Sequence, residues 1–553
     1  MCGISAIFFT LIISKKKIQS YEVHKIDFLY ITILAIVVLI LAYINFGFPF
    51  NIKYETGDPS VHYLTSEMFS ENNSILASKV SSDEVYGTLS TRKTMSYMNS
   101  GLIMECFEGI INPFDNYNIF IVFGVLILFL TAASMYTTIS NFSTDWKTRL
   151  LAFVISLLYT LGYPLNSFLF GFEYLSMSLF IICLLFDMVY YFENKELKLG
   201  YVIGIFALLN FGLFNAYYMF VPFMYPALWI YFCIYSYKKD KKIFTKKNII
   251  LLVTTLLIPF ILGFIYYMVP NIYGVIINSG VQTNTIMKTS ENLISNSFTF
   301  NGYIYVNRYS NILLLLPIPI YVAIKKRKEN NYSLLNLLFC ILFIESLLIA
   351  WMFDKVSMYY LSKNYFALWF ILFYLNYKGL IEIYKKHPKI VLELIAFYVI
   401  LISINLVFVK NKIEPLKVNP YENITTVTEV YGVNKTLLLE KPVDLYNEEL
   451  DIVKYFDTNI DHEYKTEVVG TSEQLFWFYT LTRYVNNKEE LYTSRGQNGL
   501  ERKYIATPED IETADYIVYF NKTNRYKNLK DRIEDLGNVI YENSAGGIVK
   551  CNK

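Results

Sequence analysis

Charged residues are scarce in this chain. Of its 553 residues only 17% are Asp, Glu, Lys or Arg, and 54% are hydrophobic, whereas a soluble globular protein carries about 25% charged residues. The charges are also clustered, with long apolar runs between them. Runs of about twenty apolar residues indicate transmembrane helices, because only a helix satisfies its own backbone hydrogen bonds in lipid. The scarcity of charge therefore excludes an ordinary soluble protein and predicts a polytopic α-helical membrane protein.

Cysteine and net charge are also low. The six cysteines are scattered without the spacing of metal ligands, and a disulfide between Cys106 and Cys551 stays open. The net charge is +2 with no basic face, which argues against nucleic acid as a partner. No internal repeat of about 20–50 residues is present, which argues against a repeat protein.

Twelve apolar runs are candidate membrane spans. The first, Met1–Ser14, is short and is followed by lysines, the reverse of a secretory signal, so its status as a span stays open. We therefore expect about eleven or twelve transmembrane helices. The runs are residues 1–14, 26–47, 118–141, 149–166, 174–192, 200–215, 217–237, 248–269, 311–324, 333–353, 362–378 and 390–409.

Basic residues gather in every second loop between these runs. The positive-inside rule places those loops in the cytoplasm. Three larger segments, residues 48–117, 270–310 and 410–553, are then predicted to lie outside it. The basic groups are Lys15–Lys17, Lys147 with Arg149, Lys195 with Lys198, Lys238–Lys247, Lys325–Lys328 and Lys385 with Lys386.

The last segment, residues 410–553, is polar and mixed in charge. At about 140 residues it is long enough to bury its own core. A strand-like run at Tyr516–Phe520 lies between helical pieces, and residues 539–550 have the pattern of strand, turn and strand. The chain is thus predicted to lie in the cell membrane with a multi-span domain, residues 1–409. A C-terminal α/β domain, residues 410–553, is predicted to be extracytoplasmic.

The first outer segment contains the motif Gly57-Asp58-Pro59-Ser60-Val61-His62-Tyr63. An Asp-Pro pair usually starts a turn. Residues 61–69, however, have an amphipathic helical pattern in which Pro59 fits the first turn, so that Asp58 and His62 would share one face. A carboxylate there can act as a general base or bind a divalent cation, and an imidazole can hold a phosphate or orient that carboxylate.

Glu173 is a second candidate. It lies among aromatic residues in the short outer turn predicted between the fourth and fifth spans. An acid at the membrane edge is costly without a partner, although simple exposure to water is an alternative interpretation. Asp58 and Glu173 are predicted on the same side of the membrane, so that a paired acidic site is geometrically possible.

Outer basic residues are few. Arg308 and Lys363 lie beside spans at headgroup depth, where they could hold the phosphate of a lipid carrier through charge-assisted hydrogen bonds. The alternative for each is a charged group reaching the interface without a ligand. Two acids within predicted spans, Asp187 and Glu345, are expected to be buried and would then suit an ion path and so a transporter.

The arrangement resembles the GT-C superfamily of integral membrane glycosyltransferases, which use polyprenyl-phosphate sugars and include mannosyl- and aminoarabinose-transferase-like enzymes and YfhO-like proteins. The resemblance covers the layout of the whole chain, and in sequence it rests on Gly57–Tyr63 and Glu173. It implies that Asp58 is the catalytic base or a metal-site residue and that Glu173 is a second acid. Residues 57–63 contain no Asp-Asp, Asp-Glu or Asp-x-Asp pair, so a divalent cation stays open, and no organic cofactor is expected.

The resemblance implies transfer of a sugar from a polyprenyl-phosphate carrier to an extracytoplasmic glycan, lipid or protein of the cell envelope. His62, Arg308 and Lys363 would bind the substrate. The partners would be the bilayer, the lipid-linked donor and the acceptor. A lipid-linked oligosaccharide transporter or flippase, a polysaccharide polymerase and a non-enzymatic scaffold remain the alternatives.

Overall fold

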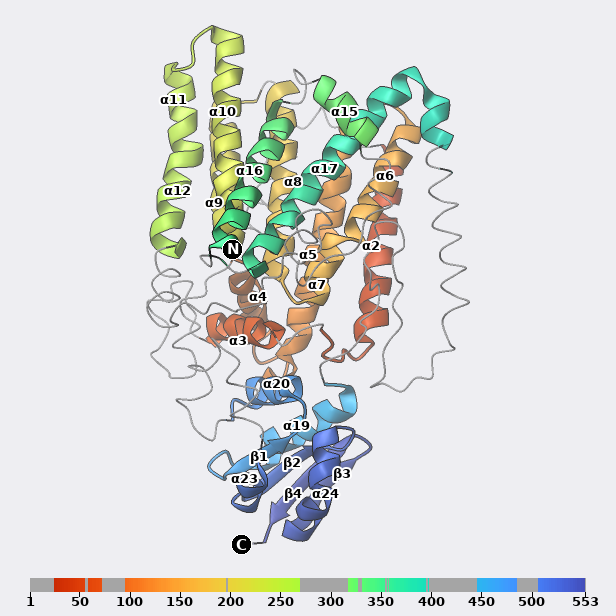
Figure 1. Ribbon diagram of the computed structural model, residues 1–553, viewed down its shortest axis with the longest axis vertical. Helices are drawn as coiled ribbons and strands as arrows, with labels where there is room; N and C mark the ends of the chain where they lie inside the picture. Colours follow the sequence, from red (N-terminus) through yellow and green to blue (C-terminus); the bar gives the residue numbers. More distant parts are fainter. Residues whose placement is uncertain are drawn as a thin grey trace.

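A helical bundle carries a small α/β domain at one end (Figure 1). The computed structural model describes residues 24–54, 58–71, 95–194, 197–268, 317–326, 331–353, 356, 358–393, 396, 445–484 and 506–552. In this part of the chain, 8 helical stretches are long and apolar enough to cross a membrane. The predicted fold class, a polytopic α-helical membrane protein followed by an α/β domain, is therefore confirmed.

The bundle helices follow the predicted apolar runs closely. The stretch Leu199–Asp240 consists of two helices, as predicted, because Tyr217 has an extended conformation between them. Residues 1–14 and most of 390–409 lie outside the described residues, so the total of eleven or twelve spans stays a prediction. The bundle helices are α2 (Lys25–Phe46), α5 (Asn116–Ser140), α6 (Trp146–Thr160), α7 (Tyr163–Leu169), α8 (Glu173–Asn194), α9 (Leu199–Tyr217), α10 (Val221–Asp240), α11 (Lys246–Leu252), α12 (Ile258–Gly263), α15 (Pro317–Lys325), α16 (Asn331–Met352) and α17 (Met358–Lys386).

Two π-helical turns, Val253–Leu257 and Phe264–Met268, continue α11 and α12 into one long apolar helix.

Side-chain hydrogen bonds at the helix ends determine where several helices begin. The carboxylate of Asp145 accepts a hydrogen bond from the backbone N–H of Thr148 at 2.8 Å and so begins α6, because the first N–H groups of a helix have no partner within it.

Two shorter helices lie between the bundle and the domain: α3 (Asp58–Glu71) and α4 (Met95–Cys106) (Figure 1). They pack closely because Gly101 has no side chain; a Cβ there would lie 2.4 Å from the carbonyl oxygen of Ser66. The hydroxyls of Ser66 and Ser100 are 2.6 Å apart, which joins the two helices by a hydrogen bond.

The C-terminal domain contains a four-stranded sheet with the strand order β1-β2-β4-β3. The central strand β2 is rich in β-branched and aromatic residues and is buried on both faces, as suits an interior strand. β1 pairs parallel with β2, whereas β4 pairs antiparallel with both β2 and β3. The strands are β1 (Thr466–Val469), β2 (Tyr516–Phe520), β3 (Gly537–Asn543) and β4 (Gly546–Cys551), and the helices are α19 (Asn447–Asn459), α20 (Ser472–Thr482), α23 (Pro508–Glu512) and α24 (Asn524–Leu536).

The strand expected at Tyr516–Phe520 and the strand–turn–strand expected at 539–550 are both present. No disulfide joins Cys106 to Cys551, both of which the structure describes. The boundary predicted at residues 409 and 410 lies outside the described residues.

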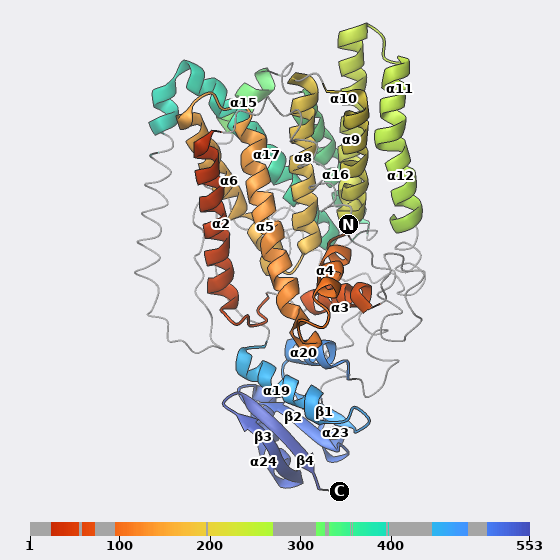
Figure 2. The same cartoon turned by 180° about the vertical axis from the view of Figure 1, so that it is seen from behind.

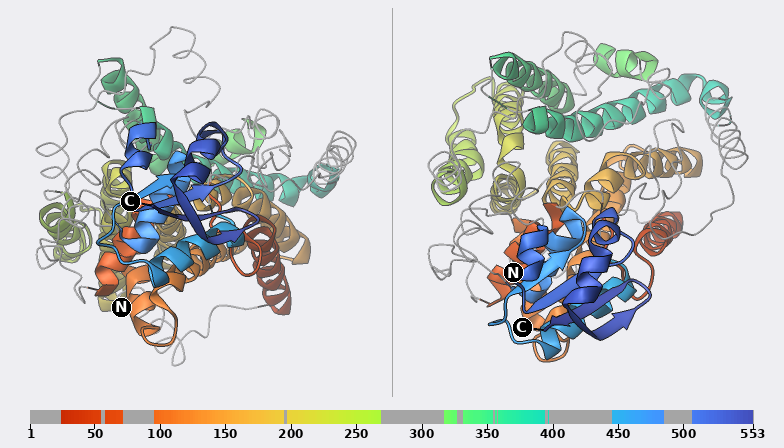
Figure 3. Two further views of the ribbon diagram at one scale, coloured as in Figure 1. Left: turned by 90° about the horizontal axis from the view of Figure 1, so that it is seen from below. Right: turned by 60° about the horizontal axis from the view of Figure 1, so that its bottom comes forward.

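The two ends of the bundle differ in charge. The α5–α6, α8–α9 and α10–α11 connections, which carry or adjoin basic residues, lie at the end remote from the domain (Figure 2). The domain covers the other end, next to α3 and α4 (Figure 3). The alternation of basic loops in the sequence thus corresponds to one basic end of the bundle.

Candidate functional site

Helix α3 presents the Asp58 motif to the bundle. The helix begins at Asp58 and includes Pro59 in its first turn, so the helix predicted over residues 61–69 is confirmed. The backbone of Asp58 is described but its side chain is not, and Arg308 lies outside the described residues. The roles assigned to Asp58 and Arg308 therefore stay predictions.

The start of α3 packs against the turn that joins α7 to α8. Gly171 in this turn has φ +67°, and a Cβ on it would lie 2.2 Å from Cγ of Pro59. Only glycine allows both this left-handed conformation and this close approach. The motif at Asp58 and the turn before Glu173 are consequently held in direct contact.

His62 is fixed by the same turn. Its Nδ1 lies 2.7 Å from the carbonyl oxygen of Gly171. A carbonyl can only accept, so Nδ1 carries the proton and donates it. The buried ring stacks on Tyr97 of α4, with centroids 5.0 Å apart, and its centroid is 5.6 Å from the rings of Phe172 and Tyr174.

Lys363 reaches the same aromatic residues from α17. Its side chain is buried, and its ammonium lies 4.4 Å from the ring centre of Phe172 and 5.0 Å from that of Tyr174. It also donates a hydrogen bond to the Tyr174 hydroxyl. Cation–π contacts and this hydrogen bond offset part of the cost of burying the charge. His62 and Lys363 are therefore brought together around Phe172 and Tyr174.

Glu173 begins α8 between these two aromatic residues. It is 1% exposed, and neither carboxylate oxygen has a hydrogen-bond partner among the described residues. Gly124 of α5 lies beside it: a Cβ on Gly124 would be 3.5 Å from Oε1 and 2.9 Å from the ring of Phe168. The interpretation in which Glu173 simply faces water is thus wrong.

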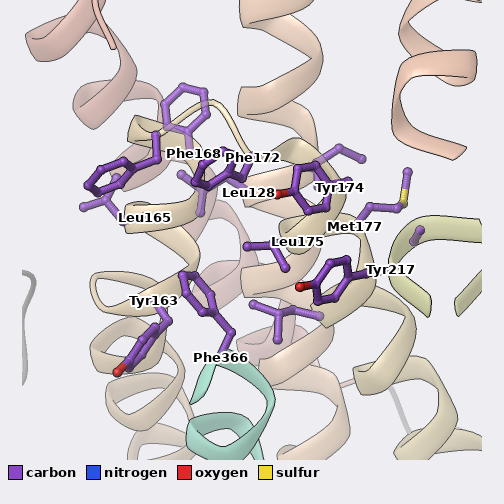
Figure 4. Packing of buried hydrophobic residues seen from close by; sticks show 14 of the residues in the cluster. Leu128, Tyr163, Leu165, Phe168, Phe172, Tyr174, Leu175, Met177, Tyr217 and Phe366 are labelled. Carbon is purple, nitrogen blue, oxygen red and sulfur yellow. The ribbon is translucent and has the colours of Figure 1, made fainter. Parts of the chain in front are cut away.

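The surroundings of this carboxylate are apolar. Figure 4 shows Phe168, Phe172, Tyr174 and Leu128 packed together at this level of the bundle. A buried polar group without a hydrogen bond costs about 1–3 kcal/mol, and more if it is charged. The N-terminus of α8 stabilises a negative charge, but this stabilisation is smaller than the free-energy cost of burying a carboxylate without hydrogen bonds. The imidazole of His62 and the ammonium of Lys363 thus contact the two aromatic residues, Phe172 and Tyr174, that flank this acid in the sequence.

The C-terminal domain covers α3 from the other side. Trp477 of α20 lies against Tyr63 and Tyr54, with ring centroids 5.9 and 6.3 Å apart. Arg483, directly after α20, pairs with Glu67 of α3 at 3.2 Å. Sequence reasoning missed these contacts, because nothing local relates residues about four hundred positions apart.

Asp187 and Glu345, the two acids that would suit a transporter, differ in their surroundings. Asp187 accepts a hydrogen bond from the side-chain amide of Asn141, which directly follows α5. Glu345 is exposed on α16, so the expectation that it is buried is wrong, because an apolar run does not show which face of its helix is covered.

The described residues contain no group of three or more His, Cys, Asp or Glu placed to hold a metal ion. Asp58, whose side chain is outside that description, keeps the question of a divalent cation open. Tyr174, Tyr97 and Gly171 are site residues that sequence reasoning missed. The glycine between Phe170 and Phe172 was the one available signal.

No protein-family model matches the chain, and no curated protein matches it in sequence. Among solved structures it is similar to ArnT from Cupriavidus metallidurans, which was solved bound to undecaprenyl phosphate. The sequence identity is 9%, the match covers 94% of this chain and 97% of that one, and the TM-score is 0.49. At this identity and score the likeness concerns the course of the chain only.

Proposed function

We propose that this protein is a membrane glycosyltransferase of the GT-C type. It moves a sugar from a polyprenyl-phosphate carrier to an acceptor hydroxyl at the end of the bundle next to the C-terminal domain. The observation that carries the proposal is the buried Glu173 carboxylate, which has no hydrogen-bond partner among the described residues. Glu173 begins α8 between Phe172 and Tyr174, whose rings contact His62 and Lys363.

An unpaired buried acid is best explained by a ligand that completes its hydrogen bonds. Ionisable groups at membrane depth are expensive and therefore usually functional. An acceptor hydroxyl can donate to such a carboxylate. Glu173 would thus orient the acceptor in a site from which the aromatic residues exclude water.

Lys363 supplies the positive charge that a phosphate donor needs. Its ammonium is buried next to the Tyr174 hydroxyl, so both can donate to a phosphate oxygen. The rings of Phe172, Tyr174 and Tyr97 would provide apolar surface for a sugar ring. His62, with Nδ1 donating to Gly171, has Nε2 as its acceptor atom.

The reaction is a displacement at the anomeric carbon. The acceptor oxygen forms a bond to that carbon as the bond between the carbon and the phosphate oxygen breaks. The acceptor proton passes to a carboxylate, assigned to Asp58 because it begins the helix packed on Gly171. The polyprenyl phosphate leaves with the bonding electron pair, stabilised by Lys363.

The proposal also includes the orientation of the protein in the membrane. The basic connections lie at the end of the bundle remote from the domain, and the positive-inside rule assigns such an end to the cytoplasm. The site and the domain would then be extracytoplasmic. A transporter has less support, because Asp187 is paired with Asn141 and Glu345 is exposed.

The test uses membranes that contain the full-length protein and a panel of radiolabelled polyprenyl-phosphate sugars. Asp58→Asn should lower transfer about 10²–10⁴-fold, the usual effect of losing a general base. Glu173→Gln should lower it about 10–10²-fold, because a hydrogen bond to a charged group contributes about 1.5–3 kcal/mol. Asp187→Asn, a change of a satisfied acid on the same helix as Glu173, should stay within about threefold of wild type. Elution of every variant as wild type in gel filtration checks folding. Retained transfer in Glu173→Gln would overturn the proposal.

A further inference from the structure

The turn between α10 and α11 concentrates positive charge. Its residues 238–247 include 6 lysines and one acid, and every one of the lysines is exposed. Two apolar side chains stand among them: Phe244 is 71% exposed and Ile243 is 41% exposed. The lysines are Lys238, Lys239, Lys241, Lys242, Lys246 and Lys247.

The turn has a fixed shape. Lys241 has φ +54°, and its backbone N–H donates to Tyr237 at the end of α10. The Ser236 hydroxyl donates to the carbonyl of Lys242 at 2.9 Å, and the Asn248 amide donates to the carbonyl of Ile243 at 2.6 Å. These bonds hold the lysines and the two apolar side chains on one preformed loop.

Lysines are denser in this turn than in the other described basic segments at this end of the bundle. There, Arg149 pairs with Asp27 at 2.7 Å, Lys326 and Lys385 both pair with Glu382, and Lys198 and Lys386 are exposed outside such a cluster. Within the part of the chain that is described, Lys241, Lys242, Lys246 and Lys247 form no ion pair. Topology alone also does not explain an exposed phenylalanine.

We propose that the α10–α11 turn is a binding site for the headgroups of anionic phospholipids. The turn joins two helical stretches that are long and apolar enough to cross a membrane and that end side by side (Figure 1), so its lysines would lie at the level of the lipid phosphates. Lysine clusters directly beside membrane spans attract anionic headgroups. Phe244 and Ile243 would enter the interfacial layer, where aromatic and aliphatic side chains are favoured. This apolar pair favours a lipid over an acidic peptide or a nucleic acid.

The site is separate from the proposed transferase site, which lies at the other end of the bundle. It therefore stands or falls independently of the proposed function. The probe is phosphatidylglycerol, and the comparison lipid is phosphatidylcholine with the same acyl chains. Both are titrated into the detergent-solubilised full-length protein, and native mass spectrometry counts the bound lipid.

Wild type should retain phosphatidylglycerol in preference to phosphatidylcholine. The combined variant with Lys239, Lys242, Lys246 and Lys247 changed to Gln should bind phosphatidylglycerol at least about tenfold more weakly, because each basic residue near the surface contributes a severalfold effect. The same four positions changed to Arg should keep binding. Phe244→Gln should weaken binding of both lipids, since it removes the apolar contact.

A matched control changes four exposed lysines elsewhere on the bundle to Gln: Lys25, Lys198, Lys386 and Lys389. This variant should bind phosphatidylglycerol as wild type does. Equal loss in the two Gln variants would overturn the proposal, because binding would then follow net charge alone. Preference for a soluble acidic polymer, such as polyglutamate, over phosphatidylglycerol would overturn it too.

Discussion

Arg483 of the C-terminal domain pairs with Glu67 of α3, with Nη2 of the guanidinium 3.2 Å from Oε2 of the carboxylate. The other oxygen of this carboxylate accepts a hydrogen bond from the hydroxyl of Tyr63. Arg483 adopts a left-handed conformation, φ +55°, as it ends α20. The domain thus holds the same helix that carries Asp58 and His62.

Replacement of Arg483 should weaken the contact between the C-terminal domain and α3 and lower the stability of the protein. Arg483→Asn tolerates the left-handed backbone but removes the guanidinium that pairs with the buried Glu67, which should cost about 1–2 kcal/mol. Arg483→Lys keeps the charge and should recover most of that loss. Thermal unfolding of the purified protein measures both. If the Arg483–Glu67 pair causes this loss of stability, the double variant Glu67→Gln with Arg483→Asn should lose little more stability than either single variant. Additive losses of stability would contradict a direct interaction between the two residues.

Gly171→Ala should separate α3 from the turn before Glu173. Any residue with a Cβ pays about 1 kcal/mol for a left-handed backbone, and here the Cβ would also meet Pro59. Displacement of the helix should add about 1–3 kcal/mol and break the His62–Gly171 hydrogen bond. The matched control is Gly109→Ala, because Gly109 has φ +76° but nothing within 4 Å. Equal shifts of the melting temperature in the two variants would refute the proposed contact.

The stability of the protein should depend on pH through Glu467. Burial, and to a lesser extent the nearby Asp510, raise the pKa of this carboxyl from 4.5 to about 7, against the opposing effect of Lys465 at 3.9 Å. The folded state therefore binds the proton more tightly than the unfolded state. This contribution is present below pH 4.5 and is lost as the pH rises through 7.

Thermal melts at pH 5 and pH 8 test this dependence. The melting temperature of wild type should fall more between the two values than that of Glu467→Gln. The exposed Glu463→Gln serves as the control and should follow wild type. A Glu467→Gln variant with the full wild-type pH dependence would assign the effect to another group.

The apolar runs predicted the bundle well because span length is a property of composition. The run at 26–47 became α2 at Lys25–Phe46, and the strand at Tyr516–Phe520 was found at the expected residues. Which face of a helix is covered depends on other helices, and for that reason the burial of Glu345 was predicted wrongly.

The site was predictable only in part, for the same reason. The predicted spans put His62, Glu173 and Lys363 on the same, outer side of the membrane. The structure brings His62 and Lys363 to one aromatic cluster. The full burial of Glu173 depends on Gly124 and Phe168, about fifty and five residues away. No local pattern contains that packing.

Glu173 should reduce the stability of the fold in exchange for function. Glu173→Met removes a buried carboxylate without hydrogen bonds and fills the space with an apolar chain, so it should raise the free energy of unfolding by about 1 kcal/mol or more while transfer is lost. Asp187→Asn on the same helix is the contrast: it weakens a satisfied bond to Asn141 and should not stabilise. Thermal unfolding in detergent measures both, and a destabilised Glu173→Met would indicate a structural role for the acid.

Lys363 should govern donor affinity. Lys363→Met keeps the length and apolar contacts of the side chain but removes the charge near Phe172 and Tyr174. Loss of one charge-assisted hydrogen bond to a phosphate costs about 1.5–3 kcal/mol, so the KM for the lipid-phosphate sugar should rise at least about tenfold.

Helix α17 offers a matched control for this change. Lys378 lies on the same helix and contacts two aromatic rings in the same way, with its ammonium 4.4 Å from the centre of Phe142 and 5.5 Å from that of Tyr374. It lies about four helical turns from Lys363, toward the basic end of the bundle. Lys378→Met should therefore leave the KM within about twofold of wild type, because it removes a half-buried charge with similar aromatic contacts that lies away from the donor. A similar rise of KM in both variants would mean that Lys363 acts through the packing of α17 and not on the phosphate.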